Sequence, residues 1–311
     1  TYSGGSDDDW GTDDGSRQLP SQIIQGLQAY QGSIGVQSIL AGLGRTAEGG
    51  TLSQSIAINT DYALSLNRDM AIIQKSSTPD VDGRVSFGNT YDFTSDLEGG
   101  IQLGGAYASK WRNKERRQAV FSTPDQEFEN ESETTYSVDI SATATAGLRY
   151  LSEHELTVAS LMLRNSDDEV SISDFHNENR QVSSGLGFRD YRMEFEEREM
   201  LVNQVKGEHV LGLTTKELLR GWADWLPTDA QVNWFYSDAK ATSDMPNRVT
   251  MAFDTVVDPT SGAVLTETLK RDSSAIDYRF TALEDEVESY GGKASIPFQL
   301  DRSAIDVKFG Y

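Results

Sequence analysis

The sequence has no cysteine, which excludes disulfide bonds and thiolate metal sites. It also has no run of about 18 apolar residues, so no transmembrane helix is predicted. Basic residues are scarce as well: 27 lysines and arginines stand against 49 aspartates and glutamates, and the formal net charge is −22. Because binding to a phosphate backbone needs a basic surface, nucleic acid is not an expected partner.

Residues with catalytic or metal-binding chemistry are few and scattered. The three histidines, His154, His176 and His209, are not at metal-ligand spacing from one another. No nucleophile-elbow, HExxH or Walker motif is present. The acidic residues are so numerous that some lie close together by chance, and their number does not indicate a catalytic pair. We therefore expect that the chain is not an enzyme.

One stretch, residues 136–150, alternates strictly between apolar and polar side chains. Its even positions are all apolar or aromatic: Tyr136, Val138, Ile140, Ala142, Ala144, Ala146, Leu148 and Tyr150. Its odd positions carry no large apolar residue: Ser137, Asp139, Ser141, Thr143, Thr145, Gly147 and Arg149. Such alternation predicts a β-strand with one dry face and one wet face. The strand is long enough to cross a bilayer, which takes roughly 9–11 residues.

Similar patterns recur along the chain and predict roughly ten strands. The others cover residues 53–66, 81–93, 97–111, 156–163, 191–210, 230–236, 276–282, 294–300 and 305–311. A further hairpin is expected from residues 249–253 and 263–268. The predicted fold class is all-β, as an antiparallel sheet over residues 51–311.

The lengths of the connections distinguish two kinds of all-β protein. Short connections are expected near residues 94, 153 and 302, and long polar ones at residues 122–134, 165–190 and 238–274. The connection at residues 211–228 falls where a short connection is expected in this alternation, but it is longer than the other short ones. Outer-membrane barrels sort their loops in this way, with short periplasmic turns and long extracellular loops. This arrangement favours part of a transmembrane β-barrel wall over a large soluble sandwich.

The facing of the strand at residues 136–150 follows from the barrel interpretation. The residues expected to face lipid are Val138, Ile140, Ala142, Ala144, Ala146 and Leu148. Those expected to face the lumen are Asp139, Ser141, Thr143, Thr145 and Arg149. The aromatic residues Tyr136 and Tyr150 would then lie where aromatic girdles occur. Trp10, Trp111, Trp225 and Trp234 could stack on sugars, but membrane-interface or structural roles fit tryptophan better.

Residues 1–50 are predicted to form an acidic, extracellular-type loop with a short amphipathic helix within residues 21–43. Asp7–Asp9, Asp13 and Asp14 could bind Ca²⁺ through their oxygen atoms, although the EF-hand spacing is absent. A solvated acidic loop fits these residues better. Elsewhere the acidic residues at 125–133, 167–169 and 284–288 are expected in loops, either as a solvated rim or bridged by divalent cations to lipopolysaccharide.

Four segments of the chain resemble one family of membrane proteins. They are DWGTDDGSRQLP at residues 9–20, EHELTVASLMLR at 153–164, EREMLVNQVKGEH at 197–209 and DMPNR at 244–248. In this order they resemble the barrel region of TonB-dependent outer-membrane receptors. Each segment alone is a weak match, whereas the set spans most of the chain.

The resemblance implies energy-coupled uptake of a scarce nutrient across the outer membrane. Substrate would contact extracellular loops, and the predicted contacts in the first segment are Trp10, Asp13, Asp14 and Arg17. The expected partners are outer-membrane lipid, lipopolysaccharide, a small-molecule or oligosaccharide substrate, and the TonB complex through a plug domain. The sequence shows no TonB box and no plug, and both of its ends look cut, so we expect an internal portion of a longer receptor.

Two other functions remain open from the sequence. The first is a passive or structural outer-membrane β-barrel, which would share the same wall. The second is a soluble β-rich carbohydrate-binding protein. The substrate itself cannot be named, because receptors for different nutrients share the wall and differ in their loops and plug.

Overall fold

The computed structural model describes residues 10–13, 15–44, 50–68, 70–74, 76–219, 221–222, 225–272, 274–300 and 303–311, without the side chains of residues 299, 300, 303 and 304. Nine strands form one antiparallel sheet in the order β1-β2-β3-β4-β5-β6-β8-β9, and β7 pairs with the end of β6. The strands are β1 (Val81–Asp92), β2 (Leu97–Ala119), β3 (Phe128–Tyr150), β4 (His154–His176), β5 (Leu186–Leu211), β6 (Ala230–Val257), β7 (Val264–Leu269), β8 (Ile276–Leu300) and β9 (Ser303–Gly310). The predicted antiparallel all-β class is confirmed.

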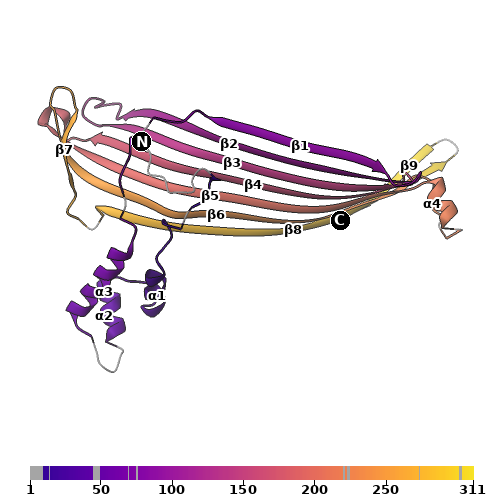
Figure 1. Ribbon diagram of the computed structural model, residues 1–311, viewed down its shortest axis with the longest axis horizontal. Coiled ribbons are helices and arrows are strands. Elements are labelled where there is room, and N and C mark those ends of the chain that lie inside the picture. Colours follow the sequence, from indigo (N-terminus) through magenta and orange to yellow (C-terminus); the bar gives the residue numbers. More distant parts are fainter. Residues whose placement is uncertain are drawn as a thin grey trace.

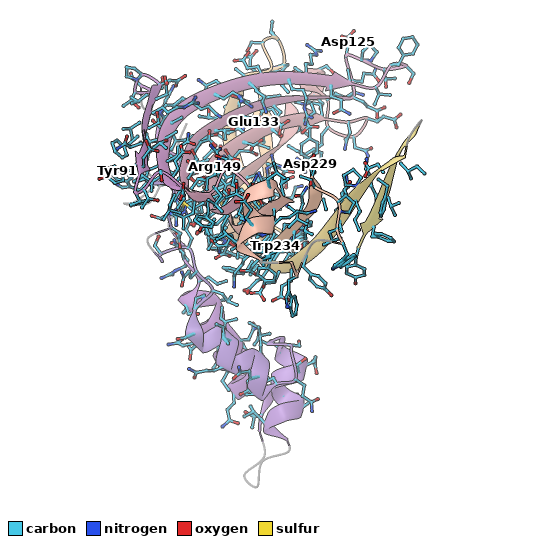
Figure 2. The ribbon with its side chains drawn as sticks, turned by 90° about the vertical axis from the view of Figure 1, so that its right-hand side faces the viewer. Tyr91, Asp125, Glu133, Arg149, Asp229 and Trp234 are labelled. Atoms are coloured by element: carbon cyan, nitrogen blue, oxygen red, sulfur yellow. The ribbon has the colours of Figure 1, made fainter. Side chains whose placement is uncertain are left out.

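The sheet is long and curved. Its strands run side by side from β1 at one edge to β8 near the other, with β7 at one end and β9 and α4 (Leu213–Leu218) at the opposite end (Figure 1). Figure 2, a view from the end that carries α4, shows the sheet curling while β1 and β9 stay apart at its two edges. Among the described residues the sheet therefore forms an open arc and not a closed barrel.

The connections are shorter than the sequence predicted, because the strands extend into regions expected to be loops. Residues 165–176 continue β4, residues 186–190 begin β5, and residues 238–257 continue β6. These polar segments remain in the sheet because charged residues on neighbouring strands pair: Arg189 lies 2.7 Å from Asp174, and Arg192 lies 2.5 Å from Glu169. The hairpin predicted near residues 249–268 is confirmed by the pairing of β6 with β7.

The acidic segment at residues 284–288 was also predicted to be a loop, and this prediction is wrong. It lies inside β8 and not in a loop, and Lys240 on β6 contacts both Glu284 and Glu286. The predicted strands at residues 276–282 and 294–300 are therefore one strand of 25 residues.

The N-terminal part of the chain is helical over a longer stretch than predicted. The expected helix within residues 21–43 consists of α1 (Ser21–Ala29) and α2 (Val36–Leu43). The strand predicted at residues 53–66 is wrong, because α3 (Leu52–Ser65) forms there. Its start is fixed by a capping box, in which Thr51 and Gln54 each bond the other's backbone N–H.

These helices project away from one end of the sheet (Figure 1). A short 3₁₀ helix, η2 (Val182–Ser184), lies between β4 and β5. In the part of the chain that the structure describes, no helix is both long and apolar enough to cross a membrane.

The two faces of the sheet differ in chemistry. We define the apolar face as the side that carries the even residues of β3 from Tyr136 to Tyr150 and their cross-strand partners, and the polar face as the opposite side. The buried cluster of the protein, Val170, Met193, Val249 and Met251, lies on the apolar face of β4, β5 and β6. It is covered by Met70 and Ile72, which follow α3.

Candidate functional site

The predicted substrate loop lies across the apolar face and is held by Arg17. The Arg17 guanidinium lies 3.2 Å from Asp13 and 2.9 Å from Asp168 on β4, and its Cζ sits 4.7 Å above the ring of Phe195 on β5. Arg17 and Asp168 are both buried. Charge pairing, hydrogen bonding and ring contact together fix this segment to the sheet.

Gly11 explains how closely this loop approaches the sheet. Its φ of +67° belongs to the left-handed region, and a Cβ there would meet Ser166 Oγ at 2.4 Å and Val138 Cβ at 3.2 Å. Next to it, Trp10 is exposed and meets the ring of Tyr107 edge-on, 5.8 Å between centroids. The loop covers the part of β3 that carries Tyr136 and Val138, and both are buried.

That burial corrects one expectation drawn from the sequence. Val138 was predicted to face lipid, but only 1% of it is exposed because the chain's own N-terminal loop lies over it. Tyr136, predicted to lie at an aromatic girdle, is buried as well. Ala142, Ala144, Ala146, Leu148 and Tyr150, farther along β3, are exposed on the same face.

The structure brings Asp13 and Arg17 together, and Trp10, on the same loop, contacts Tyr107 instead, whereas Asp14 lies outside the described residues. A carboxylate oxygen of Asp13 accepts from Arg17 and the other from the Gly15 backbone N–H, so Asp13 closes the loop. A role of these residues in substrate binding stays a prediction.

The Ca²⁺ prediction also stays untested, because Asp7–Asp9 and Asp14 lie outside the described residues. Within the residues that are described, no group of three or more histidine, aspartate or glutamate side chains is placed to hold a metal ion.

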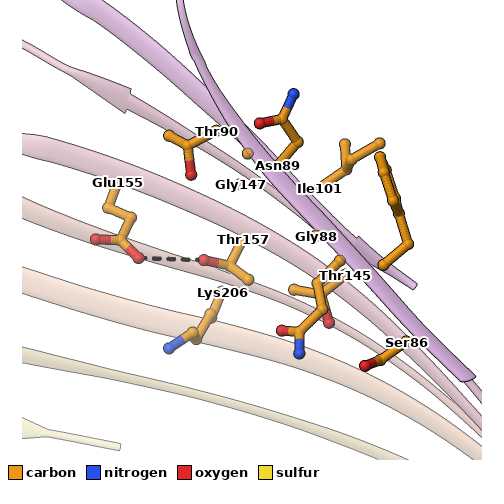
Figure 3. Close-up of a pocket in the computed structure, with 13 residues that line it drawn as sticks. Ser86, Gly88, Asn89, Thr90, Ile101, Thr145, Gly147, Glu155, Thr157 and Lys206 are labelled. Atoms are coloured by element: carbon orange, nitrogen blue, oxygen red, sulfur yellow. Dashed lines mark hydrogen bonds between the residues drawn. The ribbon is translucent and has the colours of Figure 1, made fainter. Parts of the chain in front are cut away.

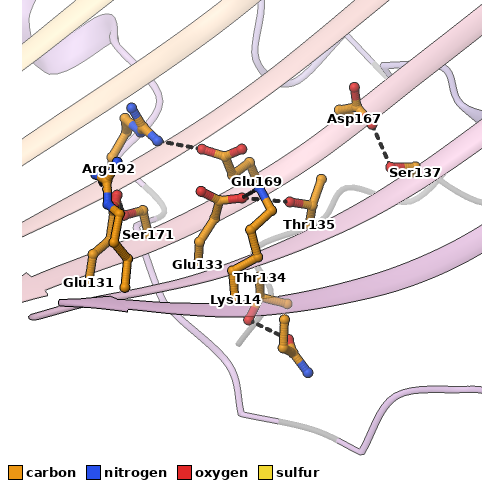
Figure 4. Close-up of polar contacts among 12 residues, drawn as sticks. Lys114, Glu131, Glu133, Thr134, Thr135, Ser137, Asp167, Glu169, Ser171 and Arg192 are labelled. Carbon is orange, nitrogen blue, oxygen red and sulfur yellow. Dashed lines mark hydrogen bonds and ion pairs between the residues drawn. The ribbon is translucent and has the colours of Figure 1, made fainter.

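The polar face carries a ladder of ion pairs in the half of the sheet away from α4 (Figure 4). Lys114 on β2 lies 2.6 Å from Glu133 on β3, and Arg192 on β5 lies 2.5 Å from Glu169 on β4. Farther along, Arg248 on β6 lies 2.5 Å from Glu194 on β5. Paired charges on neighbouring strands make this wall hydrophilic.

Smaller polar groups complete the ladder. Ser171 donates to Glu131, which also pairs with Arg116, and Ser137 donates to Asp167. The sequence showed the charges but not their partners, because Glu131 and Asp167 fall in segments that were predicted to be loops. Charged residues at every second position of both neighbours are the signal that could have indicated paired strands.

One carboxylate in the ladder is less acidic than usual. Burial raises the pKa of Glu169, Arg192 opposes that rise, and the neighbouring carboxylates Glu133 and Glu194 add to it. Burial likewise raises the pKa of Asp190, at the outer end of the same face. The polar wall therefore offers both permanent charges and carboxylates that take up protons more readily than in water.

Hollows open on the polar face of the described strands. One, of about 790 Å³, reaches from β1 to β5 and is lined mainly by hydroxyl and amide groups, with one carboxylate and one amine (Figure 3). Its polar side chains include Ser86, Thr90, Gln102, Thr145, Thr157, Glu155 and Lys206. Another, of about 600 Å³, reaches from β3 to β8 and includes Asp139, Ser141, Asn165, Arg198, Ser243 and Asp285. In Figure 2, Glu133 and Arg149 of the polar face lie inside the curl of the sheet, whereas Tyr91 of the apolar face lies outside it, so the polar face is the concave face.

The apolar face near α4 carries a broad band of exposed apolar side chains. Its exposed members are Val85, Phe87, Tyr91, Ile101, Leu103, Leu148, Leu156, Val158, Leu201, Val232, Trp234, Tyr236, Tyr290, Phe298 and Phe309. Exposed apolar patches of this extent mark a surface that meets a partner or a membrane.

The separation of the faces is less strict on the later strands. Phe235 on β6, and Leu283 and Val287 on β8, are exposed on the polar face. The acidic residues of β8 at positions 284, 286 and 288 lie on the apolar face instead. Over this short segment, apolar side chains therefore occupy the polar face and charged side chains occupy the apolar face.

No family model matches the chain, and a search among curated proteins finds no relative. The fold, the two faces of the sheet and the geometry of the described residues are the observations on which a function can be built.

Proposed function

We propose that this chain forms part of the wall of a β-barrel in an outer membrane, within a TonB-dependent receptor that takes up a scarce nutrient. The observation that carries the proposal is the exposed apolar band on the convex face, opposite a concave face lined by polar groups. Lipid would cover the band, and the polar face would line the lumen. This is the division of surfaces that transmembrane barrels use.

The size of the band supports a bilayer as its partner. From Ile140 to Tyr150 the chain takes ten steps, about 33 Å at roughly 3.3 Å per residue. A strand tilt of about 40° reduces this to roughly 25 Å, the usual height of the apolar belt. Arg164 lies directly opposite Ile140 and pairs with Glu197 and Glu199, so on β3 and β4 the apolar surface gives way to charge at that level.

The connections among β1 to β5 support the same orientation, whereas the longer connection between β5 and β6, at residues 212–229, does not. At the end that carries the band, β1 is joined to β2, and β3 to β4, by residues 93–96 and 151–153. At the other end, residues 120–127 and 177–185 make the corresponding connections, beyond strands that extend past the band. The band would therefore lie near the periplasmic rim, and the ladder of ion pairs would stand outside the bilayer.

The assignment to a receptor goes beyond the wall itself. It is supported by the four segments that resemble TonB-dependent receptors, one of which is the loop of Trp10, Asp13 and Arg17. A passive or structural barrel would have the same wall, so uptake has to be measured. In the proposed receptor, the TonB complex would act through a plug domain and lipopolysaccharide would surround the outer part of the strands.

The proposal is tested with the complete gene product in a Gram-negative host. We expect it in the outer-membrane fraction, resistant to extraction by urea and soluble only in detergent. Recovery in the aqueous fraction would contradict the membrane assignment and favour the soluble carbohydrate-binding alternative.

Uptake separates a receptor from a passive pore. Radiolabelled candidate nutrients are supplied to cells with and without a protonophore that collapses the energy source. A receptor is expected to lose accumulation when the protonophore is added, whereas entry through a passive barrel would continue at an unchanged initial rate. A protein in which residues 10–17 are replaced by a glycine-serine linker serves as the comparison for the role of that loop.

A further inference from the structure

Two histidines face each other at the end of the sheet that carries α4. His154 on β4 and His209 on β5 are directly paired in the sheet, and their Nδ1 atoms lie 3.3 Å apart. On the next strand, the indole Nε1 of Trp234 lies 3.1 Å from His209 Nε2. On the other side, His154 Nε2 lies 2.9 Å from Thr215 Oγ1 in α4.

These contacts form a row of hydrogen bonds from Trp234 to Glu153. The indole at one end can only donate and the carboxylate at the other can only accept, which fixes the direction of every hydrogen bond in the row. An indole N–H can only donate, so His209 Nε2 accepts and its proton must be on Nδ1. His209 Nδ1 then donates to His154 Nδ1, which places the proton of His154 on Nε2. That N–H donates to Thr215 Oγ1, and the Thr215 hydroxyl donates to the Glu153 carboxylate. Both imidazoles are neutral in this arrangement.

The surroundings hold each member of the chain in place. Trp234 lies over Gly207, where an added Cβ would come within 2.3 Å of the indole Nε1. The Glu153 carboxylate lies over Gly212, where an added Cβ would come within 2.1 Å of it. Glu153 also accepts from the backbone N–H groups of Thr214 and Thr215, which ties the turn between β3 and β4 to α4.

We propose that the contact between His154 and His209 is an acid-sensitive latch between the strand ends and α4. A second proton on His154 Nδ1 would face the N–H of His209. A second proton on His209 Nε2 would face the indole N–H of Trp234. Neither ring can take up a proton without losing one of these hydrogen bonds. Protonation must therefore break either the hydrogen bond between His154 and His209 or the one between His209 and Trp234. Imidazole is the side chain that changes charge near neutral pH.

Other charged and titratable groups around the latch are few among the described residues. Tyr150 on β3 stacks on His154, 6.4 Å between centroids, and Glu153 lies in the adjoining turn. On α4, Lys216 Nζ donates to the Leu226 carbonyl, and Glu217 is its neighbour in sequence. β6 contributes the indole, which does not titrate. Glu153 is the anion that the hydrogen bonds connect to His154, through the Thr215 hydroxyl.

A metal ion between the two histidines fits this geometry less well. A metal bound at His209 Nδ1 would force the remaining proton onto Nε2, where it would meet the indole N–H of Trp234. The hydrogen-bond donor at Trp234 therefore favours the proton chain over a two-histidine metal site.

The latch is tested by NMR of the complete gene product in detergent micelles, labelled with ¹⁵N in its imidazole rings. Replacement of one histidine at a time by glutamine assigns the signals of this chain's three histidines. At pH 8 we expect the proton on Nδ1 of His209 and on Nε2 of His154. His176 is the internal control, since its Nδ1 lies 3.1 Å from the Leu186 carbonyl at a distant position.

Titration from pH 8 to pH 5 gives the decisive result. The signals of His154 and His209 should move together, because the hydrogen bond between the two rings breaks in one step, whereas the signals of the distant His176 should not follow them. In a Trp234→Phe variant, His209 is released to carry its proton on Nε2, and the coupled shift should disappear. A proton on His209 Nε2 at pH 8, independent titration of the two rings, or a stoichiometric shift of both rings by Zn²⁺ alone would overturn the proposal.

Discussion

Arg17 donates to Asp168 at 2.9 Å across 151 positions of sequence, and both side chains are nearly buried. This contact helps to hold the N-terminal loop against the apolar face of the sheet. Phe195 lies under the guanidinium, so water is kept from the pair on that side. The loop therefore decides how much of the apolar face is left to meet a membrane.

Removal of this arginine should release the loop. In Arg17→Ala, Asp168 would lose this buried ion pair, and the free energy of unfolding should fall by about 3–5 kcal/mol. The measurement is denaturant unfolding, with limited proteolysis to report detachment of residues 10–17. Arg116→Ala is the matched control, because that arginine is exposed and its pairing is worth about 1 kcal/mol or less. Equal effects of the two substitutions would show that the contact does not hold the loop.

A charge on the apolar face should be far more costly than a charge on the polar face. Ala144→Lys would place an ammonium group within the apolar band, at a cost of roughly 2–4 kcal/mol if it lies at mid-bilayer. The neighbouring Thr145→Lys points to the concave side and should cost less than about 0.5 kcal/mol. Folding equilibria of the complete barrel in lipid vesicles give both values. A near-zero cost at Ala144 would argue against lipid on this face.

The tight turn between β3 and β4 is a place where stability can be gained. Leu151 and Ser152 both have φ of 55°, a conformation that favours glycine, and Glu153 N–H donates to the Tyr150 carbonyl across the turn. Ser152→Gly should raise the free energy of unfolding by about 0.5–1 kcal/mol. The same change at Ser141, inside β3, should lower it by about 0.5–1 kcal/mol. Destabilisation by both substitutions would show that the turn is not strained.

Alternation that recurs along the chain, together with the short polar segments between strands, was sufficient to predict the antiparallel all-β class. At residues 136–150 it also predicted the two faces of β3. It failed at residues 53–66, where a capping box at Thr51 and Gln54 starts a helix whose apolar residues also happen to alternate. It also underestimated strand length, because the segments at residues 165–176 and 238–257 carry charges that are stable in a sheet only when the neighbouring strand supplies partners. Those partners are distant in sequence.

The candidate site was predicted less well than the fold, for a similar reason. The loop of Trp10, Asp13 and Arg17 was recognised from its local motif, but its position over Val138 depends on Asp168 and Phe195, which lie more than a hundred residues away. The hollows on the polar face are lined by single residues from many strands. A linear sequence gives no local sign of such a surface.

Glu153 should make the turn and α4 sensitive to acid at a lower pH than histidine does. Burial raises the pKa of Glu153, but hydrogen bonds from Thr215 and Thr214 lower it overall below its ordinary value of 4.5. A carboxylate with a lowered pKa stabilises the folded state above pH 4.5, and that contribution is lost as the pH falls through its pKa in the folded protein.

The corresponding substitution is Glu153→Gln. It should reduce the free energy of unfolding by about 1 kcal/mol at pH 7, since the amide is a weaker acceptor at the start of α4. The difference from the unsubstituted protein should shrink as the pH falls below 4.5. Glu155→Gln, which loses a contact with Arg149 at 3.6 Å on the opposite face, is the control. A difference that is constant with pH would contradict the role given to the Glu153 charge.

The most direct test of the proposed membrane wall uses the absence of native cysteine in this chain. Single cysteines at Thr143, Ala144, Thr145 and Ala146 of the complete gene product are labelled with a fluorophore in vesicles that contain brominated lipid. The account predicts strong quenching at positions 144 and 146, and weak quenching with access to a water-soluble thiol reagent at positions 143 and 145. Uniform quenching along the strand, quenching at the odd positions, or no quenching at any of the four would contradict it.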